Sequence, residues 1–403
     1  MLMCSRRVPG FAFLLACSMP LAAAAHQAGQ MDMAAMDQGP SLGASAAFGP
    51  DGRLWLATAR DGHVQLRHSD DLGKHFSAAV DVNRTAEKID AHGENRPEVS
   101  VLPDGTVSVA WTHPLAKPWT SEVRFARSID GGESFSKPIT LSGNNPNGSR
   151  GFATLAVAGN GEPVIAWIDN GDVNTPKIPG KPHAASLFYS WSNDGGKTFG
   201  APRRMPGHSC ECCRIALVRE PDGRVAALFR GVYGDNIRDH SLAVLDTDGK
   251  PDDPARVTAS GWQVAACPEQ GPGLAIGSNG VMHGVWYEAK NGPAIWYGQL
   301  DPGHPPKHVL KIGGPGASHA DVAAHGDSVW IVWNQVNAKG YQLLERPSRD
   351  AGITFSAPRV IAESKVAVYS PQLLLRDGRA YTAWNTADGF RLIALHGAAG
   401  KAP

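Results

Sequence analysis

One octapeptide pattern constrains the fold of this chain more than any other feature of the sequence. Ser-x-Asp-x-Gly-x-x-Phe occurs four times without a gap, and each copy lies between two short β-like runs. This placement is typical of a turn between strands, in which Ser and Asp bond the backbone, Gly adopts a positive φ and Phe fills the gap between strands. The expected turn residues are Ser69, Asp71, Gly73 and Phe76; Ser128, Asp130, Gly132 and Phe135; Ser192, Asp194, Gly196 and Phe199; and Ser348, Asp350, Gly352 and Phe355.

A second repeat has the same phase. A turn glycine is followed six residues later by a large aromatic residue, which indicates a strand that ends on a bulky side chain. The aromatic residues recur about every 50 to 60 residues, a spacing typical of repeat proteins. The pairs are Gly105/Trp111, Gly161/Trp167, Gly223/Phe229, Gly280/Trp286 and Gly378/Trp384, and Gly326/Trp333 has one extra residue.

The two repeats together predict seven units, two of which have lost the octapeptide. Each unit has room for four strands, so we predict an all-β, seven-bladed β-propeller over residues 43–397, with six blades as the alternative count. The 46 Gly and 30 Pro of the 403-residue chain agree with a turn-rich β fold. The last unit stops near Leu395, and a strand from before Ser45 could complete it. The units begin near Ser45, Arg96, Gly151, Arg214, Gly271, His319 and Tyr369.

The first 25 residues are typical of a signal peptide. A basic pair precedes the apolar core Phe11–Leu21 and the small residues Ala23–Ala25, so we expect cleavage after Ala25 and a periplasmic or secreted protein. A lipid anchor at Cys17 is the alternative. No apolar stretch is long enough to predict a transmembrane segment. Basic and acidic residues balance at 38 each, which gives no electrostatic reason to expect a nucleic-acid partner.

The octapeptides resemble the Asp boxes of the sialidase-like, or BNR-repeat, propellers, and the resemblance covers almost all of the chain after the signal. The family includes hydrolases, assembly factors and binding proteins, so the motif indicates the fold more than the activity. The resemblance implies that a sialidase-like glycoside hydrolase would bind a substrate carboxylate with Arg96, Arg150 and Arg214. It also implies a Tyr369 nucleophile with Glu288 as its partner.

The sequence departs from that pattern in two places. Asn95-Arg96-Pro97 lacks the isoleucine of the family's Arg-Ile-Pro motif, and no Asp identifies itself as the acid/base. We therefore expect no appreciable release of sialic acid. The alternative for these arginines is a structural role where blades meet, in a non-catalytic propeller that binds a protein partner.

The cysteines form a more distinctive pattern. After signal cleavage, Cys210, Cys212 and Cys213 precede the fourth unit and Cys267 precedes the fifth, so the repeat phase predicts four thiols at one end of the channel. In an exported protein they could form two disulfides, Cys210–Cys213 and Cys212–Cys267. Alternatively they form a thiolate cluster, with His208 or His319, for a soft ion such as Cu(I) or Zn(II).

The leader over residues 26–42 points to the same metal. Cleavage after Ala25 exposes His26, whose amine and imidazole together can chelate Cu(II). Met31, Met33 and Met36 follow, and thioethers select Cu(I). The alternative is a disordered leader that happens to contain methionines. The sequence thus favours a ligand at one channel mouth, with copper as the first candidate and metal handling or tolerance as the role.

Overall fold

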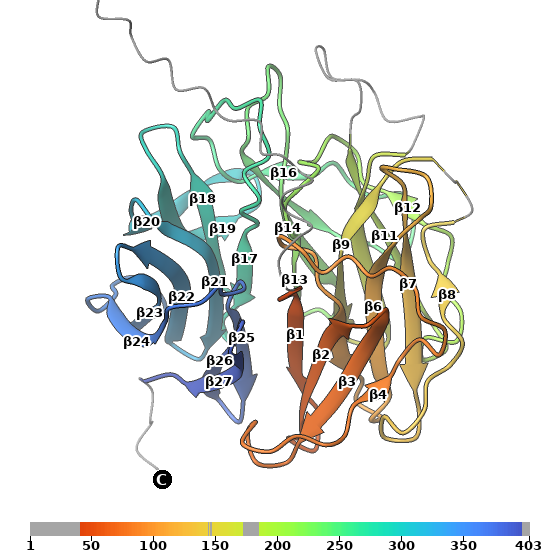
Figure 1. The fold of residues 1–403 in the computed structure, drawn as a ribbon. Helices are drawn as coiled ribbons and strands as arrows, with labels where there is room; N and C mark the ends of the chain where they lie inside the picture. Colours follow the sequence, from red (N-terminus) through yellow and green to blue (C-terminus); the bar gives the residue numbers. More distant parts are fainter. Residues whose placement is uncertain (1–40, 144, 146, 172–184, 397–403) are drawn as a thin grey trace, which may run out of the picture. The chain divides into compact units, whose positions relative to one another are not determined.

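The computed structural model describes residues 41–143, 145, 147–171 and 185–396, and within them every regular element is a β-strand. The strands form seven antiparallel sheets, here called blades 1 to 7 (Figure 1). The prediction of a seven-bladed, all-β propeller is confirmed. None of the described residues forms a helix long and apolar enough to cross a membrane.

The strands follow one another along the chain, blade by blade. Blade 1 contains β1 (Ala44–Phe48), β2 (Leu54–Arg60), β3 (His63–Ser69) and β4 (Val80–Asp81). Blade 2 contains β5 (Glu98–Val101), β6 (Val107–Pro114), β7 (Ser121–Ser128) and β8 (Ile139–Thr140). Blade 3 contains β9 (Arg150–Val157), β10 (Pro163–Asp169), β11 (Ser186–Trp191) and β12 (Arg203–Arg204). Blade 4 contains β13 (Ala216–Arg219), β14 (Val225–Arg230), β15 (His240–Val244) and β16 (Ala255–Arg256).

The remaining blades follow the same order. Blade 5 contains β17 (Gly273–Ile276), β18 (Met282–Glu288), β19 (Ala294–Asp301) and β20 (His304–Gly313). Blade 6 contains β21 (Ala317–His325), β22 (Ser328–Asn337), β23 (Gly340–Ser348) and β24 (Arg359–Ser364). Blade 7 contains β25 (Gln372–Arg376), β26 (Arg379–Thr386) and β27 (Gly389–Ala394). Each blade is a meander in which neighbouring strands are consecutive in the chain.

The first strands of the blades close a ring. β1 packs beside β5, and the cycle continues through β9, β13, β17, β21 and β25 back to β1. The Ala46 N–H donates to Gln372 Oε1 (2.9 Å), and Asn385 Nδ2 donates to the Leu42 carbonyl (2.8 Å), which joins blades 1 and 7. Blade 7 has three strands among the described residues. The predicted fourth strand, the signal peptide and most of the leader lie outside them.

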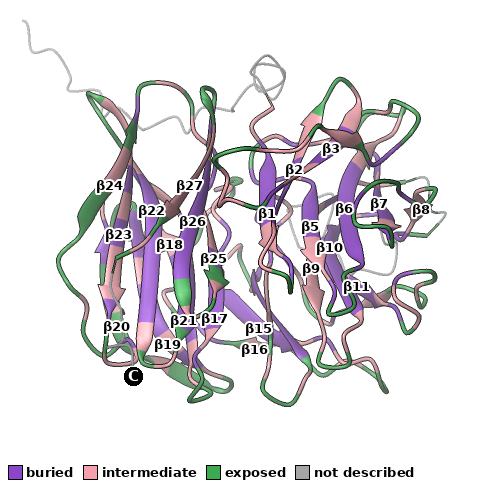
Figure 2. Cartoon of the chain, turned by 90° about the horizontal axis from the view of Figure 1, so that it is seen from below, coloured by how far each residue is buried: buried purple, intermediate pink, exposed green. Residues whose placement is uncertain are grey.

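The core is divided among the interfaces between blades. The aromatic residues of the second repeat lie in the second strands, as predicted, and all are buried (Figure 2). Because successive side chains of a strand point to opposite faces, each second strand packs against both neighbouring blades. The buried aromatic residues are Trp111, Trp167, Phe229, Trp286, Trp333 and Trp384.

All four Asp boxes join the third strand of a blade to the fourth, in blades 1, 2, 3 and 6. In the second box, Ser128 Oγ donates to Asp130 (2.6 Å) and accepts the Gly132 N–H (2.8 Å). The same Ser–Gly bond measures 2.8–3.0 Å in the other boxes. Gly132 has a φ of 83°, a conformation that glycine adopts without steric cost, and this is why the motif requires glycine at that position. The hydrogen bonds from Ser128 and Ser134 lower the pKa of Asp130 to about 2.

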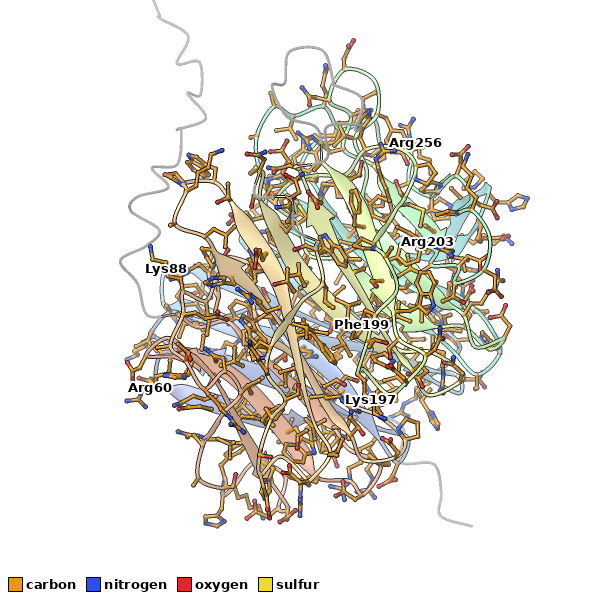
Figure 3. All side chains as sticks on the ribbon, turned by 90° about the vertical axis from the view of Figure 1, so that its right-hand side faces the viewer. Arg60, Lys88, Lys197, Phe199, Arg203 and Arg256 are labelled. Atoms are coloured by element: carbon orange, nitrogen blue, oxygen red, sulfur yellow. The ribbon has the colours of Figure 1, made fainter. Side chains whose placement is uncertain are left out.

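The expectation that all four box phenylalanines are buried is wrong for three of them. Phe135 is buried at 6% exposure and shares a cluster with Trp55, whereas Phe76, Phe199 and Phe355 are half-buried. Phe199, labelled in Figure 3, comes from the turn between β11 and β12. These three rings pack on an aromatic residue of the preceding blade, and the length of the fourth strand does not explain their exposure, because β8 beside the buried Phe135 has two residues and β24 beside Phe355 has six. The ring pairs are Phe76–Phe390, Phe125–Phe199 and Tyr297–Phe355.

Candidate functional site

A buried carboxylate joins several blades inside the ring. Glu94, just before β5, is wholly buried and accepts the backbone N–H groups of Arg214 (3.0 Å) and Gly271 (2.6 Å). The Arg214 guanidinium donates to it at 2.5 Å, and His319 Nδ1 lies 3.1 Å away. Burial opposes ionisation, but Arg214 and His319 nevertheless hold the pKa of Glu94 at about 2. Segments leading into blades 2, 4 and 5 thus meet β21 of blade 6 at one carboxylate.

His319 reaches this carboxylate through a backbone irregularity. It lies in β21 at a shift of register between Ser318 and Asp321, with a φ of 52°. Its N–H donates to Gln270 Oε1 (2.8 Å). A β-bulge of this kind re-aims a side chain, here towards Glu94.

A second group of charges lies beside the first. Arg96 donates to Glu98 (2.6 Å), and the Tyr369 hydroxyl donates to the Asn95 carbonyl (3.0 Å). Burial raises the pKa of Glu98, Asp321 and Tyr369, and Arg96 acts on all three electrostatically. A protonated hydroxyl that donates to a carbonyl is not activated as a nucleophile.

The residues implied by the sialidase resemblance are only partly brought together. Arg96, Arg214 and Tyr369 belong to the network around Glu94. Arg150 instead donates to Asp169 (3.0 Å) within blade 3, and the Glu288 side chain makes no hydrogen bond or ion pair with the described residues.

Sequence reasoning missed the acidic members of this network. Glu94, Glu98 and Asp321 face the arginines, and none was expected at the site. Glu94 lies two residues before Arg96, where the repeat phase places the loop leading into a blade. That position is the signal that could have identified it.

The cysteines form the second candidate site. Residues 208–210 run between blades 3 and 4, where the Ser209 N–H donates to the Ala185 carbonyl (2.9 Å) and the Cys210 N–H to the Arg230 carbonyl (2.8 Å). This backbone pairing fixes Cys210 inside the interface. Phe152, at a bulge in β9 with a φ of 57°, packs against the three cysteines that follow.

Cys210, Cys212 and Cys213 are buried, with their sulfur atoms all within 4.8 Å of one another. The Cys210 sulfur lies 3.6 Å from each of the other two. A disulfide requires about 2.05 Å, so this is the reduced state of the cluster. Oxidation to a Cys210–Cys213 disulfide stays a prediction.

The three thiols of this sulfur cluster differ in the direction of their pKa shifts. Hydrogen bonds from Cys212 and Cys213 place the pKa of Cys210 well below its usual value, and Arg238 and Arg230 add to the effect. The bond to Cys210 raises the pKa of Cys212, and burial raises that of Cys213. Cys210 is therefore the sulfur of the three that loses its proton most readily.

Buried polar atoms without partners surround the cluster. Arg230 Nε, His240 Nε2, Ser209 Oγ and His208 Nδ1 lack a hydrogen-bond partner among the described residues. Burial places the pKa of His240 well below its usual value, so its imidazole is neutral. Each such buried atom requires an explanation, and an ion or water bound at the cluster would supply one for these four.

The remaining predicted ligands do not belong to the three-sulfur group. Cys267 is exposed, and its side chain is a hydrogen-bond partner of Cys212. His208 lies outside the three-sulfur group, and Arg204 and burial lower its pKa. His319 binds Glu94 instead. His26, Met31, Met33 and Met36 lie outside the described residues.

Comparison with known proteins supports the fold alone. No family model matches the chain, and no curated protein matches it. Among solved structures it is similar to an ulvan lyase of polysaccharide lyase family PL25, at 12% identity over 89% of this chain and 92% of that one, with a TM-score of 0.54. It is also similar to the K499G mutant of NanB sialidase from Streptococcus pneumoniae, at 9% identity over 86% and 84%, with a TM-score of 0.52. The resemblance to sialidase-like propellers is confirmed as a resemblance of fold.

Proposed function

We propose that this protein binds Cu(I) through Cys210, Cys212 and Cys213, and that it handles this metal outside the cytoplasm. The observation that carries the proposal is the buried group of three sulfur atoms within 4.8 Å of one another. A metal bonded to three coplanar sulfurs at about 2.3 Å requires them to be about 4 Å apart. The cluster is close to that geometry before any metal binds.

The ligand set favours copper over zinc. Structural Zn²⁺ takes four ligands in a tetrahedron, and among the described residues the cluster supplies three. Thiolates select soft ions such as Cu(I). Three sulfurs close to one another, with Cys267 outside their group, therefore suit Cu(I) better.

The buried arginines near the cluster suit the net negative charge of a Cu(I) ion bound by three thiolates. Cu(I) with three thiolates carries a net charge of about −2, which is costly to bury without compensation. Arg230 and Arg238 are buried and act on Cys210 electrostatically. Two guanidinium groups would therefore balance the loaded site.

Competition between the reduced protein and a Cu(I) chelator tests the proposal. We expect one tightly bound ion, lost in Cys212→Ser/Cys213→Ser and retained when residues 26–37 are deleted. The deletion is the matched control, because it removes His26 and the three methionines but no cysteine. Weak binding by fully reduced protein would refute the proposal, and native thiols that resist titration would favour structural disulfides.

A second candidate function is suggested by the shared location of Arg96, Arg214 and Tyr369. The structural neighbours are named as glycan-active enzymes, and guanidinium groups suit an anionic sugar. Each of these arginines is, however, already paired with a glutamate, which argues against the sialidase hypothesis. Turnover of a fluorogenic sialoside that disappears in Arg96→Ala and Tyr369→Phe would establish it.

A further inference from the structure

The sulfur cluster is closed on most sides. Cys210 and Cys213 are each 2% exposed and Cys212 is 8% exposed, while Phe152 packs against the group. An ion cannot reach Cys210 or Cys213 directly from solvent. Cys212 is the most accessible of the three, and it is the one that contacts Cys267.

Cys267 lies on a loop that is fixed at both ends. On one side the Val264 N–H donates to the Asn236 carbonyl (3.2 Å). On the other, the Gln270 carbonyl accepts Arg230 Nη2 (2.7 Å). Residues 265–267 between these anchors are exposed. The loop therefore holds an exposed thiol against a buried one.

Two further features mark this loop. Glu269 has a φ of 46°, a conformation that costs free energy for a residue with a side chain and that collects at functional sites. Its side chain is half-buried. An acidic side chain thus lies two residues from the exposed thiol.

We infer that Cys267 is the access thiol of the cluster, the residue through which a soft cation passes from solvent to Cys212 and then to all three buried sulfurs. The metal part of this inference rests on the proposed function. It assigns Cys267 a kinetic role, distinct from that of the three ligands that set affinity.

The transfer is a series of ligand exchanges at Cu(I). Cys267 loses its proton to solvent and displaces one donor of the carrier that brings the ion. Cys212 then loses its proton and displaces the second donor. Cys213 then loses its proton to solvent and binds together with the Cys210 thiolate, and Cys267 leaves as a thiolate and takes up a proton from solvent. The metal stays Cu(I) throughout, so no oxidant or reductant is required.

Stopped-flow transfer of Cu(I) from a coloured chelator complex to the reduced full chain measures the access step. In Cys267→Ser we expect the rate to fall at least about tenfold and the affinity to change less than about threefold, because a hydroxyl is a poor ligand for a soft ion. Ala266→Ser adds a hydroxyl to the same exposed loop and should behave as wild type. An unchanged rate in Cys267→Ser would overturn the inference. An affinity loss as large as that of Cys213→Ser would instead make Cys267 a core ligand.

A metal-free assay separates this inference from the proposed function. With an aromatic disulfide reagent, Cys267 displaces one aromatic thiolate and forms a mixed disulfide. Cys212 then attacks that disulfide, releases the second aromatic thiolate and leaves a Cys212–Cys267 bond. We expect two rapid equivalents from wild type and no rapid phase in Cys267→Ser. A rapid phase that survives this substitution would disprove the access role, whereas a normal rapid phase without Cu(I) uptake would reject only the metal proposal.

Discussion

Two buried polar clusters contain consecutive residues of the chain, Cys213 and Arg214. They differ in how many of their polar groups have hydrogen-bond partners. Arg214 belongs to the network around Glu94, where the carboxylate receives two backbone N–H groups, a guanidinium and an imidazole. Cys213 belongs to the sulfur cluster, where Cys210 has only weak sulfur–sulfur contacts to Cys212 and Cys213. Buried polar atoms without partners surround only the second of these two sites.

This difference in hydrogen bonding indicates a structural role for the cluster around Glu94 and a binding role for the sulfur cluster. A buried network with all its hydrogen bonds made fixes the arrangement of the segments that build it, and a ligand could enter only by breaking those bonds. The S–H···S bonds of the sulfur cluster are weak, and a soft cation can replace the two protons without moving the sulfurs far. We therefore assign stability to the first cluster and binding to the second.

The largest expected effect is the loss of the carboxylate network. Glu94→Gln leaves Arg214 without its counter-charge, and the difference between pKa values of 4.5 and about 2 corresponds to about 3 kcal/mol of the free energy of unfolding. Urea unfolding at neutral pH measures it, and the exposed Glu133→Gln is the matched control. A cost no larger than that of the control would show that the network does not hold the blades together.

The same carboxylate predicts a dependence of stability on pH. The pKa of Glu94 is lowered in the folded state, so its contribution is fully present above pH 4.5 and is lost as the pH falls towards about 2. Between pH 5 and 3, wild type should lose part of its advantage over Glu94→Gln. Two parallel stability profiles over that interval would contradict the pKa assigned to Glu94.

A smaller effect is expected from truncation in the sulfur cluster. Cys213→Ala removes one buried sulfur and no charge, so we expect a loss of about 1 kcal/mol, typical of a single substitution. Cu(I) affinity should fall far more than stability. A loss of stability comparable to that of Glu94→Gln would contradict the assignment of stability to one cluster and binding to the other.

The smallest expected effect is the number of protons released when Cu(I) binds. The pKa of Cys210 lies well below its usual value and those of Cys212 and Cys213 are raised, so we expect binding of one Cu(I) to release about two protons, from Cys212 and Cys213. Calorimetric titrations in buffers of different ionisation enthalpy give the number. Release of about three protons would show that Cys210 is a thiol before the metal binds.

The fold could be predicted from the sequence because each blade repeats the same local requirements. A positive-φ glycine at residue 132 and a buried aromatic at residue 111 are fixed by turn and strand geometry alone. The repeat phase also placed Cys267 on the blade next to the other cysteines, across a long gap in sequence.

Side-chain directions could not be predicted in this way. Repeat phase places Arg150 at a channel mouth, but its guanidinium turns back to Asp169 within its own blade. Glu94 acquires its role only where segments of blades 2, 4 and 5 meet β21, a contact that no local pattern encodes. The box phenylalanines differ in burial although their octapeptides match, because the packing of each ring is set by the neighbouring blade.

X-ray absorption at the copper edge of the loaded, reduced full chain tests the central claim most directly. We predict three sulfur ligands at one distance of about 2.3 Å, unchanged when residues 26–37 are deleted and altered in Cys213→Ser. A nitrogen or thioether in the first coordination sphere that disappears with the deletion would place the copper on the leader and contradict a site in the sulfur cluster.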